Sequence, residues 1–206
     1  MSDGFCSGFS RSFNAGKWLL FLPFWLLISS LYGFEFARNS HPLFVIVFSE
    51  TASPLEKMAL DDLQQFLGAM CGNPFQVLPE SQVGQQKAIY LGQTQYAARH
   101  GIDFASLGQE EWVVRNREGN LIISGGRPAG TFYGVWAVLK KAGCWSLTMD
   151  QLLIPHKPDL AVDIADEQKQ PAFAGRLIYN DFPGKAMLAK MPPEAEKAYN
   201  LWLLRS

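Results

Sequence analysis

The run LFVIVF at residues 43–48 places the strongest constraint on how this chain folds. It is continuously apolar and rich in β-branched residues, whereas a strand with one face in water alternates apolar and polar residues. The run therefore predicts a strand that is covered on both faces. A sheet built on such a strand needs helices packed on it, which indicates an α/β architecture.

The residues after this strand predict a helix with a well-defined start. Ser53 is placed as the N-cap, Pro54 as the first helical residue and Glu56 three positions after the cap, which is the pattern of a capping box. The helix is expected to end at Gly72 and Pro74. Its buried face is predicted from the apolar residues at three-to-four spacing: Leu55, Met58, Ala59, Leu63, Phe66 and Met70. Four polar residues are expected to face away from the core: Asp61, Asp62, Gln64 and Gln65.

Shorter elements follow before the next long helix. Strands are predicted over residues 75–78 and 88–91, and a short helical piece over 93–100. Residues 112–116 and 120–124 are predicted to form a hairpin, in which Gly119 supplies a positive φ.

A glycine-rich segment, SGGRPAGTFYGVWAVLKKAGCW, covers residues 124–145 and has two interpretations. A phosphate-binding loop needs several backbone N–H groups at a helix N-terminus. However, Pro128 removes one donor, and the spacing matches neither G-x-x-x-x-G-K-[ST] nor G-x-G-x-x-G. Gly130 and Gly134 share one helix face, where an interior glycine costs about 1 kcal/mol relative to alanine. Close approach of the helix to the sheet accounts for this cost, so we predict a packing turn.

The end of the first domain is less regular. Irregular or short-strand structure is expected after Cys144, then a strand over residues 159–164 and a polar connector over 165–170. Residues 43–164 thus predict an α/β (α+β) sandwich with a mixed sheet and two main helices. Residues 171–179 predict one more strand and residues 193–204 one helix. Since one strand and one helix cannot close a core, we expect 171–206 to open a further domain whose remainder is missing.

The first 33 residues have the composition of a secretory signal peptide. Arg11 and Lys17 precede an apolar run at residues 18–28, and Gly33 is the expected last residue removed. The alternative is an uncleaved membrane anchor, although residues 18–32 are short for a span that needs about 20 residues. We therefore expect export to the periplasm or the medium, with membrane contact only through this segment if it stays uncleaved.

Charge and composition limit the partners and ligands. A formal net charge of -1 provides no field to attract nucleic acid. The three histidines share no ligand spacing with one another or with a cysteine, so neither a metal site nor a cofactor is expected. Cys71 and Cys144 each end a predicted helix and could pair in an exported protein. We favour two buried free thiols.

Five pieces of the sequence, in order, resemble the N-terminal α/β domain of exo-acting glycoside hydrolases. The glycine-rich piece resembles the pattern G-x-x-x-x-G-x-x-Y-G-[VA]-x-x-x-L. The families are the family 67 α-glucuronidases, the family 20 β-hexosaminidases, and related bacterial proteins of unknown function whose barrels look α-glucuronidase-like. The pieces are IYLG at 89–92, EEWVV with EGNLIISG in the hairpin, LIISGGRPAGTFYGVWAVL, AGCW at 142–145 and QPAFAGRLIYND at 170–181.

In those families the α/β domain precedes a (β/α)8 barrel that carries the chemistry, so the resemblance implies that residues 171–206 begin this barrel. The catalytic acids lie on later barrel strands, and no catalytic residue is expected in this chain. The segment PAFAGR matches the family 20 pattern P-x-F-x-x-R-G through Arg176, although Leu177 replaces the last glycine. Arg176 is a candidate for binding sugar hydroxyls or a uronic carboxylate, or for an ion pair at the barrel rim. Asp181 would follow the same strand, as a second substrate-binding candidate or as a loop carboxylate.

The sequence thus predicts a non-catalytic accessory domain of an exported glycoside hydrolase, inactive as this fragment, with the absent barrel as its partner. The alternative is a stand-alone carbohydrate-binding or protein-interaction module. Trp112, Trp145 and Trp202 are its candidate sugar-stacking residues, and burial in the core or an interface is their competing role.

Overall fold

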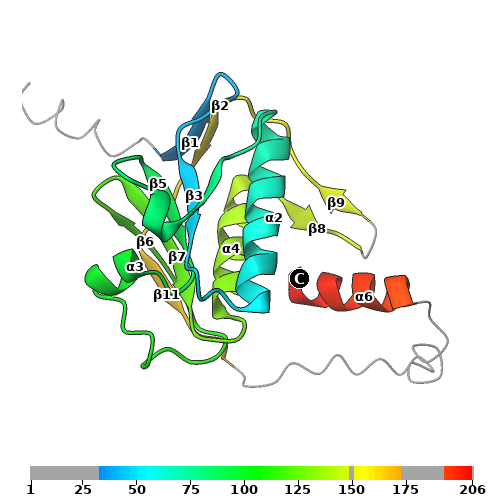
Figure 1. Cartoon of the computed structure of the whole chain (residues 1–206). Coiled ribbons are helices and arrows are strands. Elements are labelled where there is room, and N and C mark those ends of the chain that lie inside the picture. The colour runs from blue at the N-terminus through cyan, green and yellow to red at the C-terminus, as the bar shows by residue number, and fades with distance from the viewer. Residues whose placement is uncertain (1–32, 149–150, 173–192, 206) are drawn as a thin grey trace, which may run out of the picture. The chain divides into compact units, whose positions relative to one another are not determined.

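The computed structural model describes residues 33–148, 151–172 and 193–205, and a six-stranded mixed sheet is the centre of this part of the chain (Figure 1). Its strand order is β11-β6-β7-β5-β3-β4. Strands β4, β3, β5 and β7 pair in parallel, whereas β6 pairs antiparallel with both β7 and β11. The strands are β3 (Val45–Phe48), β4 (Val77–Pro79), β5 (Ala88–Leu91), β6 (Trp112–Arg117), β7 (Asn120–Gly125) and β11 (Glu167–Lys169).

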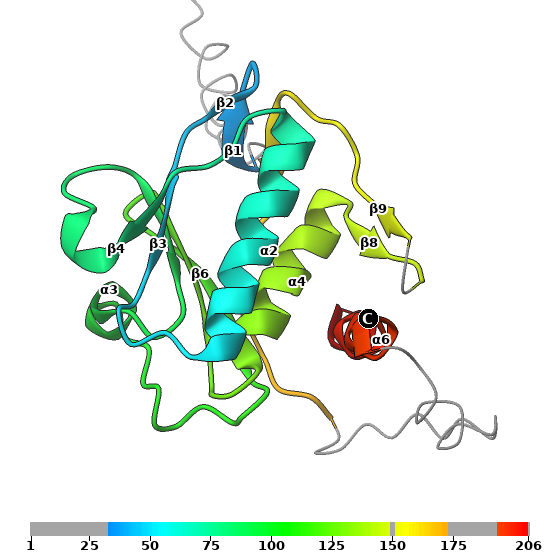
Figure 2. The same cartoon turned by 45° about the vertical axis from the view of Figure 1, so that its right-hand side comes forward.

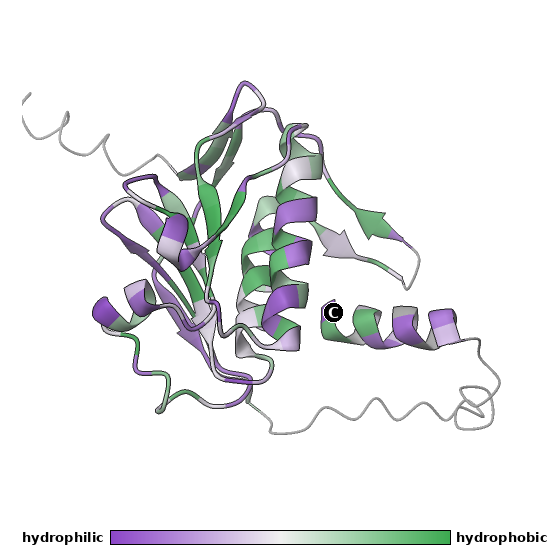
Figure 3. Cartoon of the chain, viewed as in Figure 1, coloured by the Kyte–Doolittle hydropathy of each residue, from purple (hydrophilic) through white to green (hydrophobic). Residues whose placement is uncertain are grey.

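Both faces of this sheet are covered, as the run at 43–48 predicts. One face packs under the two long helices α2 (Pro54–Cys71) and α4 (Gly130–Ala142), which lie side by side in both views (Figures 1 and 2). Ile46 on β3 belongs to this core, and Val47 belongs to a second core under the short helix α3 (Gln95–Arg99). Figure 3 shows β3 as a continuous apolar strand. The predicted mixed sheet with helices packed on it is therefore confirmed.

Helix α2 starts and ends where the sequence predicts. The Ser53 hydroxyl accepts a hydrogen bond from the Glu56 N–H at 3.3 Å, and the Glu56 carboxylate accepts one from the Ser53 N–H at 2.7 Å. This reciprocal pair is the capping box. At the other end, Gly72 has a φ of 90° and donates to the Gly68 carbonyl at 2.8 Å. A side chain disfavours this left-handed conformation, so glycine ends the helix.

The predicted hairpin is present, with residues 118 and 119 as its turn. Glu118 has a φ of 53° and Gly119 a φ of 76°, so both turn residues are left-handed. Positive φ at both central positions matches the right-handed twist of the two arms. The turn joins β6 and β7, which pair from Arg117 opposite Asn120 to Trp112 opposite Gly125.

Two further small sheets flank the main one. Residues 34–42, to which the sequence assigned no element, form β1 (Phe34–Arg38) and β2 (His41–Pro42), and β1 also pairs with β10 (Leu160–Val162). Strands β8 (Trp145–Ser146) and β9 (Leu152–Leu153) form a second, two-stranded sheet in the segment where short strands were expected. The remaining elements are a 3₁₀ turn, η2 (Glu80–Gln82), and helix α6 (Pro193–Arg205), the latter at the predicted position.

The interpretation of residues 165–170 as a connector is wrong. Residues 167–169 form strand β11, which adds to the edge of the sheet beside β6. Ion pairs hold this strand and the residue before it: Asp166 pairs with Arg117 at 2.6 Å, and Glu167 in the strand pairs with Lys141. An exposed polar edge strand carries no apolar signal, so hydrophobic patterning cannot distinguish it from a loop.

The expectation that Asp62 faces away from the core is also wrong, because its side chain is buried. Cys71 and Cys144 are free and buried, as favoured above. In the described ranges no helix is long and apolar enough to cross a membrane. The predicted signal segment at 1–33, apart from Gly33, and the predicted strand at 171–179, apart from its first two residues, lie outside the described residues.

Candidate functional site

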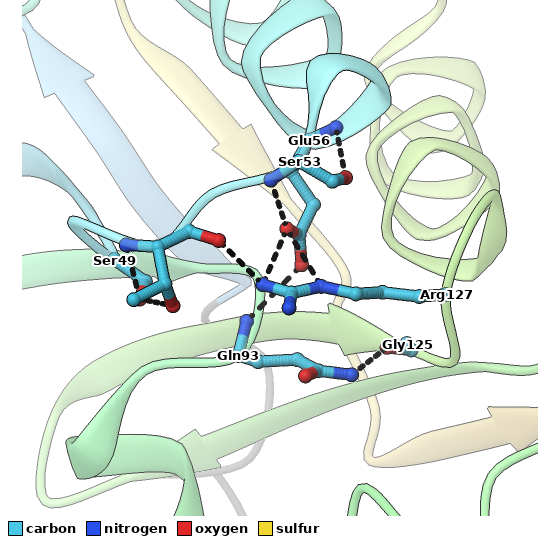
Figure 4. Close-up of polar contacts among 7 residues, drawn as sticks. Ser49, Ser53, Glu56, Gln93, Gly125 and Arg127 are labelled. Carbon is cyan, nitrogen blue, oxygen red and sulfur yellow. Dashed lines mark hydrogen bonds and ion pairs between the residues drawn. The ribbon is translucent and has the colours of Figure 1, made fainter.

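The carboxyl ends of the parallel strands β3, β5 and β7 meet at one edge of the sheet (Figure 4). In open α/β sheets, ligands commonly bind in the crevice at this edge. Here the edge is occupied by Glu56, from the first turn of α2, and Arg127, from the loop between β7 and α4. We call this ion pair, with the backbone groups bound to it, the Glu56–Arg127 clamp.

The clamp joins three segments that are distant in the sequence. The Glu56 carboxylate accepts hydrogen bonds from Arg127 Nε at 3.1 Å and Nη2 at 2.9 Å, and from the N–H groups of Ser53 at 2.7 Å and Gln93 at 3.4 Å. Arg127 Nη2 also donates to the Thr51 carbonyl at 2.8 Å. The Glu56 side chain is only 2% exposed. A Cβ at Gly92 would lie 2.9 Å from its Oε1, so the loop after β5 fits closely against the carboxylate.

This geometry determines what the carboxylate can do. A general acid or base needs an oxygen free to reach a reacting atom. Both oxygens of Glu56 are already bound by N–H donors, and its charge is balanced by Arg127. The clamp therefore fixes the loops at the carboxyl edge and does not supply a reactive group.

The glycine-rich turn beside the clamp has no free phosphate cradle. The Gly126 N–H donates to the Glu111 carbonyl at 2.9 Å, and the Gly130 N–H donates to the Gln109 carbonyl at 3.1 Å. A Cβ at Gly126 would lie 1.9 Å from the Gly108 carbonyl oxygen, and one at Gly130 would lie 2.1 Å from that of Glu111. The backbone at 108–111 thus takes the place that a phosphate would need. The turn is a packing turn, as predicted.

Asp62 is the second buried carboxylate among the described residues. Its Oδ2 accepts hydrogen bonds from the Trp136 indole N–H at 2.8 Å and from Arg205 Nε at 3.1 Å, and its Oδ1 accepts one from Arg205 Nη2 at 2.5 Å. Arg205 lies on α6, so this carboxylate connects three helices. A cavity of about 180 Å³ adjoins the group, between Trp112, Tyr133 and Leu204. It is smaller than the roughly 300–1,000 Å³ of typical ligand pockets.

The described residues that the sequence proposed for binding, Trp112, Trp145 and Trp202, lie on three different elements. Arg176 and Asp181 lie outside the described residues. Trp112 on β6 is partly buried beside the Lys169 ammonium, 5.5 Å from its ring, and Trp202 on α6 is also partly buried. Trp145 on β8 is 48% exposed, with the Lys140 ammonium 6.0 Å from its ring. Of the three tryptophans, Trp145 is the one with an exposed side chain.

Sequence reasoning found Glu56 only as a capping residue and missed its pairing with Arg127. The two residues are 71 positions apart, and no local pattern links them. Asp62 was missed because its polar type suggested the solvent face. Among the described residues, no group of three or more His, Cys, Asp or Glu side chains is placed to hold a metal ion.

The fold resembles part of a glycoside hydrolase of known structure. A family GH115 4-O-methyl-α-glucuronidase, with specificity for decorated arabinogalactans, matches 79% of this chain with a TM-score of 0.57 and 18% sequence identity. The two proteins share a fold. This supports the glycoside hydrolase-like fold expected from the sequence, without selecting family 67 or family 20. This chain covers 24% of that enzyme's length. Neither a protein-family model nor a curated protein sequence matches the chain.

Proposed function

We propose that this chain is a non-catalytic N-terminal accessory domain of an exported glycoside hydrolase that acts in carbohydrate degradation. The observation that carries the proposal is the fold shared with the GH115 enzyme over 79% of this chain. The match accounts for 24% of that enzyme, so most of the enzyme lies outside the shared fold. The proposed partner is a catalytic (β/α)8 barrel that follows the sandwich.

The buried carboxylates support a role without catalysis. Most glycosidases use two carboxylic acids on either side of the scissile bond, about 5–9.5 Å apart according to mechanism. Among the described residues, Glu56 and Asp62 are the buried carboxylates, and an arginine neutralises each of them. Groups bound in this way hold helices and loops together.

Two further parts of the proposal concern segments that lie wholly or almost wholly outside the described residues. Residues 1–33 act as the export signal, and their removal would leave every described strand and helix intact, because β1 begins at Phe34. Arg176 and Asp181 contribute to sugar binding only within the complete barrel. Their guanidinium and carboxylate suit hydroxyl or uronate groups.

An antibody against the sandwich tests the proposal in the source organism. On an immunoblot of cells grown on plant polysaccharide, we expect a polypeptide much larger than 206 residues. Peptide sequencing of that band should identify residues that follow position 206 and whose pattern predicts barrel strands. A native product of this length alone, present and stable in the exported fraction, would contradict the accessory-domain proposal.

The exposed side chain of Trp145 supports the second candidate, a stand-alone carbohydrate-binding module. Sugar rings stack on exposed aromatic faces, and such stacking changes tryptophan fluorescence. Titration of the full chain with xylan, arabinogalactan and chitin oligosaccharides separates the two candidates, with Trp145→Ala as the matched variant. A saturable change that Trp145→Ala abolishes would favour the binding module, and a flat response favours the accessory domain.

A further inference from the structure

Asp62 is a buried carboxylate whose charge is not balanced within the sandwich alone. Its side chain is 5% exposed, yet within the sandwich the group that donates a hydrogen bond to it is the neutral indole N–H of Trp136. A buried carboxylate is strongly disfavoured unless a cation or several donors neutralise it. The sandwich therefore presents a negatively charged group that needs a positive partner from another segment.

That partner is Arg205, and its surroundings suit a guanidinium. Two of its nitrogens bind the two Asp62 oxygens, at 2.5 and 3.1 Å, in the paired geometry that a planar guanidinium makes with a carboxylate. Its central carbon lies 5.6 Å from the Phe66 ring and 5.5 Å from the Trp136 ring. A guanidinium also gains from cation–π contact with such rings, whereas an ammonium cannot bind both oxygens at this geometry.

The same helix brings apolar side chains to the same face. Leu201 and Leu204 of α6 pack against the core under α2 and α4, and Leu204 lies near Met58 of α2. Figure 3 shows that α6 is polar at its start and apolar toward its end. The apolar end thus lies over the sandwich, beside the charged contact.

We infer that the face formed by α2 and α4 is a docking surface for helix α6, and that Asp62, Phe66 and Trp136 form a receptor for the guanidinium of Arg205. The receptor gives the docking its specificity for arginine, and the leucines add apolar contact. This inference does not depend on the proposed function. If α6 begins a barrel, the receptor is the point at which the sandwich holds that barrel in place.

Hydrogen exchange of the full chain, measured by mass spectrometry, tests the docking. A 13-residue helix is marginally stable alone in water, so slow exchange of α6 amides requires its contact with the sandwich. Asp62→Asn removes the charge at nearly constant shape, and Arg205→Lys keeps a cation but removes the fork. We expect each to accelerate exchange of the α6 amides by about tenfold or more, because each variant loses hydrogen bonds between charged groups.

The controls separate docking from folding. Asp61→Asn changes an exposed neighbour and should leave α6 exchange at the wild-type rate, and amides of β5 and β7 should stay protected throughout. Arg205 lies outside the sandwich. If Asp62→Asn unfolds the sandwich, the exchange rate measured for Arg205→Lys therefore serves as the test. The inference is overturned if wild-type α6 amides exchange as fast as an unstructured peptide. It is also overturned if Arg205→Lys stays within twofold of the wild-type rate.

Discussion

Replacement of Glu56 by alanine should destabilise the sandwich more than any ordinary surface substitution. The change removes the carboxylate that joins the start of α2 to the loops after β5 and β7. It leaves the Ser53 N–H without its capping partner and Arg127 without its counter-ion. Because Glu56 is 2% exposed, water cannot readily replace the lost acceptor.

The magnitude follows from the individual contacts. The cap bond contributes about 1 kcal/mol, and the bonds from Arg127 contribute about 1.5 kcal/mol, the lower end for charged groups. We take the lower end because the Arg127 side chain is 37% exposed and can regain water. Glu56→Ala should therefore lower the free energy of unfolding by about 2–3 kcal/mol, or Tm by roughly 5–10 °C for a chain of this size.

Urea unfolding followed by circular dichroism measures this cost. Glu50→Ala is the matched control, because Glu50 is exposed, and it should change the unfolding free energy by less than about 0.5 kcal/mol. Arg127→Gln should also destabilise, and the double variant should cost less than the sum of the two single variants, since the pair is coupled. If Glu56→Ala costs no more than Glu50→Ala, the clamp does not hold these loops and the reasoning fails.

Three further predictions concern the turn, the edge strand and a thiol. Gly130→Ala should lower the unfolding free energy, measured in urea, by more than about 1 kcal/mol, although alanine has the better helix propensity. The reason is that the new Cβ would lie 2.1 Å from the Glu111 carbonyl oxygen. A stabilised variant would refute the packing turn. The hydrogen bond from Lys141 lowers the pKa of Glu167 below 4.5, so this pair stabilises the fold above that pH and the contribution is lost as pH falls through the lowered pKa. Between pH 5 and 3, wild-type unfolding free energy should fall more steeply than that of Lys141→Met, and equal slopes would show that the pair does not contribute. Burial raises the pKa of Cys144 to about 11. Iodoacetamide at pH 8 should therefore label this thiol slowly in the native protein and rapidly in urea, which peptide mass spectrometry measures. Rapid labelling of the native protein would contradict the burial of Cys144.

The elements that could be predicted are those with a local signal. The capping box at Ser53 and Glu56 determines where α2 begins, and the left-handed Gly72 determines where it ends. Each of these signals involves only residues that are close in the sequence. The hairpin turn likewise depends on Gly119 and its neighbours alone. The run at 43–48 required cover on both faces, which led to the α/β class. In each case the structure is determined by residues that are close in the sequence, so the sequence pattern alone predicts it.

The remaining features depend on contacts between distant segments. Strand β11 is polar and exposed, and it exists because its backbone pairs with β6, some fifty residues earlier, as in the pairing of Glu167 with Val114. The pairing of Glu56 with Arg127 and the burial of Asp62 arise only when the helices and loops are assembled. Charged residues of this kind are normally solvated, and patterning therefore assigns them to the surface. Arg176 and Asp181 were proposed from a resemblance and stay predictions.

A hydrolysis assay of the full chain tests the central claim, which is that these residues supply structure and an interface but no glycosidase chemistry. The chain is incubated with 4-nitrophenyl glycosides and 4-nitrophenyl glucuronides, and nitrophenolate release is followed against a buffer blank. The account predicts release no faster than the blank. Turnover above the blank that is lost in Glu56→Gln or Asp62→Asn, with the fold retained, would contradict it.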